Sequence, residues 1–291
     1  MNIEQILFKK IKQRAEALKI KFKIALVSPD VEMIDAGRRA LKNNLAEIIA
    51  IHNESISGIQ TVIVKNPEEA ILSSIDLAMI GKVNTIAKGF VNTAKFLSKI
   101  VCSDFRTGYI THTSIIEVPG FSNLFVISDG TVTPQPNIEQ KIEIIKNSIK
   151  CAKILGIEKP KVALLSANEL VLEDISSGHD AAIISKMAKN GQMTDAIIDG
   201  PMALDSALSL EAVHRKKLTF SFNPPANVLI APDLESGALL IKSAVYFGKA
   251  AVSGVLWGTR RPIVLTSRAD TAEAKYISIC ICKLAMAGEY K

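Results

Sequence analysis

The sequence predicts an α/β protein of two doubly wound domains, each with a mostly parallel sheet between layers of helices. Three observations support this prediction. Short apolar runs alternate with amphipathic stretches along most of the 291 residues, which is the order of strands and helices in βαβ units. The alternation breaks once, at a hairpin and a turn-rich loop near 109–137. A hydrophobic content of 48% is enough for a core in each half.

The first series of elements precedes the hairpin. An apolar stripe predicts a helix over 3–19, made by Ile3, Ile6, Leu7, Ile11 and Leu18. Asn66 and Pro67 predict another helix start, because proline suits the first helical position. The remaining predicted elements are strands at 23–27, 46–51, 61–64 and 77–80, a helix at 31–43, and a helix that follows the loop 81–85 and ends near 98.

The second series begins after a predicted β-hairpin. In this hairpin, strands at 110–118 and 124–128 flank the turn residues Pro119-Gly120. Asn137 is expected to cap a helix that Gly156 ends. Strands are predicted at 161–165, 196–198, 228–231 and 252–256. Three helices are expected between them: one that ends near 189, one that contains Asp205 and one that ends near 248. A last strand and helix are predicted at 263–288. We therefore predict a first domain of residues 1–132 plus 260–291 and a second domain of residues 133–259.

Charge and composition exclude several classes of function. Lys and Arg number 35 against 29 Asp and Glu, but aromatic residues are only 5% and are not interleaved with the basic ones. Base-stacking platforms need such aromatics, so nucleic-acid binding is disfavoured and a polyanionic small molecule fits better. The sequence contains no run of 18 apolar residues, no signal peptide and no C-x-x-C pair. These features predict a cytoplasmic protein with free thiols and no membrane partner.

Common catalytic motifs are absent from the sequence. It contains no G-x-x-x-x-G-K-[ST], G-x-G-x-x-G, H-E-x-x-H or G-x-S-x-G pattern. The histidines are isolated from one another and from every cysteine; they are His52, His112, His179 and His214. We therefore expect neither a metal site nor a serine hydrolase.

The strongest candidate site is the stretch 262–275. A short apolar strand runs into Thr266-Ser267-Arg268 and then into a helix, with Asp270 as the expected N-cap and Glu273 completing a capping box. Such a turn presents unpaired backbone N–H groups, and an arginine fork beside them suits a phosphate or an acyl phosphate. The alternative interpretation is that Ser267 and Asp270 only cap the helix.

Ligands of doubly wound sheets bind at the carboxyl ends of strands, so the other loops predicted to follow strands are candidates as well. These are 81–85, Arg106, 199–201, 233–237 and Gly258. Together they predict a polar cleft between the domains. For each loop alone, capping and tight turns are the alternative explanation.

Three segments give the sequence a specific resemblance. The stretch 199–209, starting Asp199-Gly200-Pro201, resembles the "DGP…D.A.S" segment of the phosphate acetyl/butyryltransferases. The stretch 231–237 with Lys242 also resembles that family, and 264–271 is similar to its "LTSRADS" signature. Residues 81–85, Arg106, Thr111-His112 and parts of 128–157 resemble its N-terminal half. The sequence Ser-Arg-Ala-Asp-Thr resembles the phosphate butyryltransferase branch of the family more closely than the acetyltransferase branch.

The resemblance implies two α/β domains with an interdomain cleft, related in fold to isopropylmalate dehydrogenases. It implies the reaction acyl-CoA + phosphate ⇌ acyl phosphate + CoA, with coenzyme A as a substrate, no cofactor, no metal and a homo-oligomeric assembly. In relatives, the signature serine contacts the CoA thiol and the arginine holds the phosphoryl end of acyl phosphate. These roles carry over to Ser267 and Arg268.

The catalytic base and the substrate contacts are less determined. Relatives place an aspartate one helical turn beyond the signature, where this chain has Glu273-Ala274-Lys275, so Asp270 and Glu273 are the candidates. Arg106 resembles an arginine on the CoA side; Lys82 and Thr85 would line the same wall, with a solvated surface role as the alternative for Lys82. The predicted substrate-binding residues are Arg106, Lys82, Thr85, Gly200, Pro201, Asp233, Glu235 and Gly258.

Two other functions compete with the transferase. A CoA- or acyl-phosphate-binding protein without catalysis fits the missing aspartate and the Ser28-Pro29-Asp30 turn. A metal-dependent dehydrogenase of the related fold would need a cluster of aspartates, which the sequence lacks. Acyl-chain preference is expected to depend on residues near Gly258, Trp257 and Met202, and the sequence does not determine it.

Overall fold

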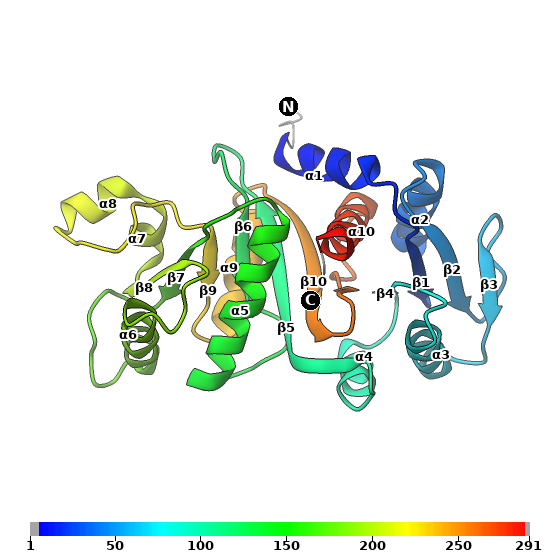
Figure 1. The fold of residues 1–291 in the computed structure, drawn as a ribbon, viewed down its shortest axis with the longest axis horizontal. Coiled ribbons are helices and arrows are strands. Elements are labelled where there is room, and N and C mark those ends of the chain that lie inside the picture. The colour runs from blue at the N-terminus through cyan, green and yellow to red at the C-terminus, as the bar shows by residue number, and fades with distance from the viewer. Residues whose placement is uncertain (1–5, 289–291) are drawn as a thin grey trace. The chain divides into compact units, whose positions relative to one another are not determined.

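The computed structural model describes residues 6–288 (Figure 1). Its contacts group the chain into two compact units, Met1–Ile110 with Val252–Lys291, and Thr111–Ala251. The divisions fall within strand β5 (Arg106–Glu117) and at the start of strand β10 (Ala251–Thr259), not in the turn-rich loop. The domain ranges inferred above, with boundaries after 132 and 259, stay a prediction.

The first unit contains a mostly parallel sheet. Its strands lie in the order β3-β2-β1-β4-β11-β10. Their bounds are Gln60–Ile63 (β3), Glu47–His52 (β2), Lys23–Val27 (β1), Thr85–Lys88 (β4) and Ile263–Val264 (β11), followed by β10. Neighbouring pairs from β3 to β11 are parallel, whereas β11 and β10 are antiparallel. Every residue of β4 and four of the five in β1 are buried, which explains the apolar runs Ile24–Val27 and Ile86-Ala87 within them.

Helices cover both faces of this sheet. The crossovers β1–α2–β2 and β3–α3–β4 run in opposite directions along the strand order, so right-handed connections place α2 and α3 on opposite faces. Accordingly, α10 packs against α1 and α2, whereas α3 packs against α4 (Figure 1). The helices are α1 (Ile6–Ala17), α2 (Val31–Lys42), α3 (Pro67–Met79), α4 (Thr93–Val101) and α10 (Ala272–Ala287). The predicted start of α1 at residue 3 lies outside the described residues.

The second unit has the strand order β5-β6-β9-β7-β8. The predicted hairpin is confirmed, since β5 and β6 (Phe125–Ser128) are antiparallel, and the pairs from β6 to β8 are parallel. The other strands are β9 (Val228–Ile230), β7 (Lys161–Leu165) and β8 (Ile197–Met202). Its helices are α5 (Ile138–Ile154), α6 (Ser176–Lys189), α7 (Leu204–Leu208), α8 (Leu210–Arg215) and α9 (Leu234–Tyr246). The α/β class is thereby confirmed, as is the cap at Asn137, which forms a capping box with Gln140.

One predicted strand is wrong. Residues 77–79 form the last turn of α3, and Ile80 is its C-cap. The apolar run was misread because a short apolar segment does not distinguish a helix end from a buried strand. The strand of this region is β4, at residues 85–88, where a helix had been predicted. The loop 81–85 therefore follows helix α3 and lies at the amino end of strand β4, whereas it had been expected to follow a strand.

Three local predictions also need correction. Asp199, Gly200 and Pro201 are part of strand β8, and Gly258 is part of strand β10, so neither lies in a loop after a strand. The N-cap of α10 is Thr271, whose hydroxyl accepts from the Ala274 N–H, and not Asp270. Glycine and proline were read as the ends of strands, but here they occupy strand interiors where another backbone approaches closely.

Candidate active site

The signature turn follows strand β11 in the first unit. The Ser267 N–H donates to Asp270 Oδ2 at 2.8 Å, and the Asp270 N–H donates to the Ser267 carbonyl at 3.2 Å. The Ala269 N–H donates to Ser267 Oγ at 3.3 Å. Asp270 therefore closes the turn rather than capping the helix. This leaves the side chains of Ser267 and Arg268 exposed at the carboxyl end of the strand.

The loops after β1 and β4 lie next to this turn, because β4 pairs with both β1 and β11. The Phe90 N–H donates to the Ser28 carbonyl at 2.7 Å. Gly89 fits so closely that a Cβ there would lie 2.5 Å from that same oxygen. The Arg268 guanidinium carbon lies 5.7 Å from the centre of the Phe90 ring, a cation–π contact. Three strand ends thus form one edge around Arg268.

Helix α10 adds a buried ion pair at this edge. Lys275 Nζ donates to both carboxylate oxygens of Asp30 at 2.7 Å, and the lysine side chain is 1% exposed. Asp30 also caps α2 by accepting from the Met33 N–H. The pair therefore joins α10 to the loop after β1, and it occupies the carboxylate of Asp30.

Lys88, the last residue of β4, has a different environment. It is 2% exposed, and among the described residues its ammonium group has one hydrogen-bond acceptor, the Gly89 carbonyl at 3.2 Å. Burial and the nearby charge of Arg268 lower the pKa of Lys88 to about 8, although Asp30 acts in the opposite direction. The sequence reading missed this residue because it assigned the region to a helix. The available signal was an apolar run, Ile86-Ala87, that ends in Lys-Gly.

Of the two candidate bases, Glu273 is occupied. Its carboxylate accepts from Lys12 and from Arg39, both at 2.6 Å. Burial alone would raise the pKa of Glu273, but these hydrogen bonds outweigh it and the pKa is lowered. A carboxylate in this state is a weak base and fixes α10 to α1 and α2. Asp270 is the candidate that lies within the signature turn.

The other predicted residues of the first unit lie away from this turn. Thr85 is buried at the start of β4 and donates to the Pro262 carbonyl, and Lys82 is exposed in the turn before it. Arg106 is exposed at the start of β5, where its Nε donates to the Gly108 carbonyl at 3.0 Å. Gly258 has a φ of 88°, and a Cβ there would lie 2.2 Å from the Tyr109 carbonyl oxygen. The structure therefore does not group these four residues with Ser267 and Arg268.

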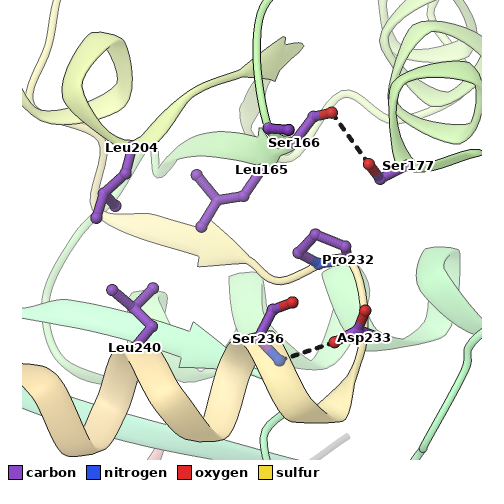
Figure 2. A pocket seen from close by; sticks show the side chains of 9 residues that line it. Leu165, Ser166, Ser177, Leu204, Pro232, Asp233, Ser236 and Leu240 are labelled. Carbon is purple, nitrogen blue, oxygen red and sulfur yellow. Dashed lines mark hydrogen bonds between the residues drawn. The ribbon is translucent and has the colours of Figure 1, made fainter. Parts of the chain in front are cut away.

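The second unit has a cavity of about 400 Å³ at the carboxyl ends of β7 and β9 (Figure 2). Leu165, Leu204 and Leu240 lie on one side of it in this view, and two hydrogen-bonded pairs lie on the other. In these pairs the Ser166 and Ser177 hydroxyls are 3.0 Å apart, and Asp233 Oδ1 accepts from the Ser236 N–H at 2.7 Å. The remaining lining residues are Ala167 and Pro232.

Asp233 and Ser236 of the predicted loop 233–237 line this cavity, and Asp233 caps α9. Glu235 lies in the first turn of that helix and is exposed. Asp199 accepts from the Ser221 N–H and hydroxyl, both at 2.7 Å, so its carboxylate holds a loop against β8. Gly200 lies against β7, where a Cβ would be 2.7 Å from Leu164 Cβ, and Pro201 follows it in β8. Asp233, Asp199 and Gly200 thus each have a structural function in the fold.

A buried carboxylate that the sequence analysis did not single out lies at the end of β6. Asp129 is 3% exposed and accepts from the Thr131 N–H at 2.8 Å and the Val132 N–H at 2.9 Å. Burial raises the pKa of Asp129, although the charge of His112 and these hydrogen bonds act in the opposite direction. Gly237 of α9 packs directly on it, since a Cβ there would be 2.7 Å from the Asp129 carbonyl oxygen.

Residues 6–288 contain neither a cluster of metal-binding side chains nor a membrane-spanning helix. No three His, Cys, Asp or Glu side chains are grouped as ligands of a metal ion would be. None of the helices in this range combines the length and the apolar character needed to cross a membrane.

Comparison with known proteins gives consistent matches over most of the chain. A model of the family described as "Phosphate acetyl/butaryl transferase" matches residues 6–282. The phosphate butyryltransferase of Clostridium acetobutylicum is 35% identical, over 95% of this chain and 97% of the relative. The phosphate acetyltransferase of Thermotoga maritima is 36% identical, over 74% of each chain.

Solved structures agree with these sequence matches. A branched-chain phosphotransacylase from Enterococcus faecalis superimposes with a TM-score of 0.81 at 26% identity, covering 90% of this chain and 99% of that one. A phosphotransacetylase from Streptococcus pyogenes also gives a TM-score of 0.81, at 20% identity and over 99% of this chain and 100% of that one, which supports the fold alone.

Proposed function

The chain belongs to the phosphate acetyl/butaryl transferase family, and from this premise we propose that it is an acyltransferase for short acyl groups. The reaction is acyl-CoA + phosphate ⇌ acyl phosphate + CoA. The observation that carries the proposal is the exposed Ser267-Arg268 turn at the carboxyl edge of the first unit, with the additional cation Lys88 beside it. Coenzyme A is a substrate in this proposal, and no cofactor or metal takes part.

In the direction that forms acyl-CoA, the thiol of CoA loses its proton and its sulfur attacks the carbonyl carbon of the acyl phosphate. The bond between that carbon and the phosphate oxygen breaks, and phosphate leaves with the electron pair. Negative charge develops on the carbonyl oxygen and on the departing phosphate, and a fixed guanidinium stabilises such charge. We assign this role to Arg268.

Ser267 and Asp270 act on the thiol in this proposal. The Ser267 hydroxyl orients the sulfur, and Asp270 takes its proton as the thiolate forms. The choice of Asp270 over Glu273 is supported by the two ion pairs that occupy Glu273. Deprotonation matters because a free thiol has a pKa of about 8.5 and the thiolate is the nucleophile.

The substrate contacts remain proposals with unequal support. Asp233 is supported by its position in the wall of the cavity, which has room and leucine side chains for an apolar group. Arg106 and Lys82 are exposed cations that suit the phosphates of coenzyme A. For Thr85, Gly200, Pro201, Glu235 and Gly258 the support is the family resemblance alone.

The decisive experiment compares Arg268→Ala with the control Arg215→Ala. Arg215 is an exposed arginine of α8 that pairs with Glu211. Thiol release from acetyl-, propionyl- and butyryl-CoA is measured with and without phosphate. The wild type and Arg215→Ala should release thiol only with phosphate, whereas Arg268→Ala should be about 100- to 1,000-fold slower. Its fold should be unchanged, because Arg268 is exposed.

Two results would contradict the assignment. Near-wild-type turnover in Arg268→Ala would remove this residue from the mechanism. Saturable CoA binding by the wild type, without thiol release from any of the three thioesters, would instead indicate a binding protein that lacks catalysis.

We also propose a homo-oligomer located in the cytoplasm. Helix α9 supports the assembly, because Gly237 is its one buried residue while Leu239 and Tyr246, and Phe247 directly after it, are at least 64% exposed. Exposed apolar side chains on one helix are typical of a covered interface. Light scattering after chromatography should give a multiple of the 31.5 kDa chain mass, and Leu239→Lys with Phe247→Glu should reduce it to one chain.

A further inference from the structure

We propose that Lys88 is a second cationic ligand of the phosphoryl group beside Arg268, and that it takes up a proton when the anion binds. The ligand class is a tetrahedral oxyanion, namely inorganic phosphate or the phosphoryl end of an acyl phosphate. The inference rests on the proposed function and adds a residue that the sequence resemblance did not indicate.

The first argument is the charge balance at this edge of the sheet. Three charged groups act on Lys88 of β4 there: Arg268 of the signature turn, Lys275 of α10 and Asp30, the N-cap of α2. Lys275 holds both oxygens of Asp30 at 2.7 Å, so that pair is internally neutral. Lys88 and Arg268 remain without a carboxylate hydrogen-bond partner among the described residues. Two neighbouring cations of this kind form a site for a doubly charged anion.

The second argument is the burial of Lys88. An ammonium group removed from water is costly unless an anion accompanies it, so a 2% exposed lysine with one carbonyl acceptor is an incomplete arrangement. Lys275 at the same edge is equally buried, but it is paired with Asp30. The missing partner is supplied when an oxyanion lies against Arg268.

Proton uptake follows from the same geometry. Without a ligand, burial and the charge of Arg268 lower the pKa of Lys88 to about 8. A bound dianion reverses the local charge and restores the ammonium form. Binding at a pH above 8 must therefore add a proton to Nζ, whereas binding at pH 7 requires almost none.

Titration calorimetry with sulfate tests this directly, because sulfate is tetrahedral and exchanges no proton in this range. The measurement is made at pH 7 and pH 9 in two buffers with different ionisation enthalpies, which yields both Kd and the protons taken up. The variants are Lys88→Arg, Lys88→Met and the control Lys99→Met. Lys99 belongs to the same unit, pairs with Glu68 on the helix surface and carries the same charge.

At pH 9 the wild type and Lys99→Met should take up about one proton per sulfate. Lys88→Arg should bind sulfate without proton uptake, since arginine keeps its charge. Lys88→Met should bind roughly tenfold more weakly or worse, also without uptake. Unchanged affinity in Lys88→Met, persistent uptake in either Lys88 variant, or no measurable sulfate binding by the wild type would each overturn the inference.

The test is separate from the test of acyl transfer. If sulfate behaves as expected but no thioester is turned over, the anion site stands and the transferase proposal fails. If turnover is phosphate-dependent but Lys88→Met matches the wild type in Kd and proton uptake, the inference about Lys88 fails alone.

Discussion

The strand ends of the two units differ in how their polar groups are satisfied. In the second unit, Asp233 caps a helix, Asp199 accepts several hydrogen bonds from one loop and strand, and Ser166 pairs with Ser177 beside a leucine-lined cavity. In the first unit, Arg268 is exposed and Lys88 is buried without a carboxylate of its own. Polar side chains thus hold the backbone in the second unit, whereas in the described part of the first unit two neighbouring cations lack a carboxylate hydrogen-bond partner.

Lys275→Met should have the largest effect on stability. It removes the partner of Asp30 at a site where the lysine is 1% exposed, and breaking a buried ion pair typically costs about 3–5 kcal/mol. Chemical denaturation of Lys275→Met against Lys153→Met measures the difference. Lys153 pairs with Asp195 on the surface of the second unit, so its loss should cost at most about 1 kcal/mol. Equal losses would mean that the pair at the first edge contributes no more than a surface pair.

The next largest effect is the pH dependence due to Lys88. Its pKa is 10.5 in the unfolded reference and about 8 in the folded protein. Between these values the unfolded state binds one more proton, so the free energy of unfolding gains from this group as pH rises from 8 to 10.5. The full gain is about 3 kcal/mol.

Lys88→Met should lack this gain and be more stable than the wild type near pH 7. Because other groups titrate in the same range, the informative quantity is the difference between wild type and Lys88→Met, from denaturation at pH 7, 8, 9 and 10. A difference that does not change with pH would show that Lys88 has an ordinary pKa, which would weaken the contrast between the two edges.

The smallest effect concerns Asp233 in the second unit. Asp233→Ala should lose about 1 kcal/mol of stability, since the cap of α9 is removed, whereas Asp233→Asn should keep the cap. If Asp233 acts only on the backbone, Asp233→Asn should also keep its turnover and its KM values. A raised KM for acyl-CoA in Asp233→Asn, with stability unchanged, would show that the carboxylate contacts the substrate, and the second edge would then resemble the first.

Much of this fold could be predicted from the sequence because local chemistry decided it. Strands β1 and β7 match their predicted ranges, and the Asn137 cap and the hairpin at Pro119-Gly120 form as expected. In each case, residues adjacent in sequence carry the relevant information, such as a capping side chain or an apolar run bounded by turn residues. Ser267 and Arg268 were found in the same way, from one contiguous segment.

Lys88 and its neighbours could not be found locally. The apolar residues 77–80 resemble a strand, and only packing in the folded unit shows that they end α3 and that β4 follows. The group of Asp30, Lys88, Arg268 and Lys275 joins segments up to 245 positions apart, and no spacing rule connects them. Glycine at 200 and 258 was read as a loop marker, although its function is to admit a neighbouring backbone.

The first unit is assembled from both ends of the chain, with 110 residues before the second unit and Val252–Lys291 after it. During synthesis, β11, the signature turn and α10 leave the ribosome only after the second unit has its whole sequence. Until then β4 lacks its neighbour β11, and α1 and α2 lack the helix α10 that packs against them. Arg268 can therefore reach its position beside Lys88 only after the second unit has been synthesised, and a protein truncated before residue 260 should lack the anion site.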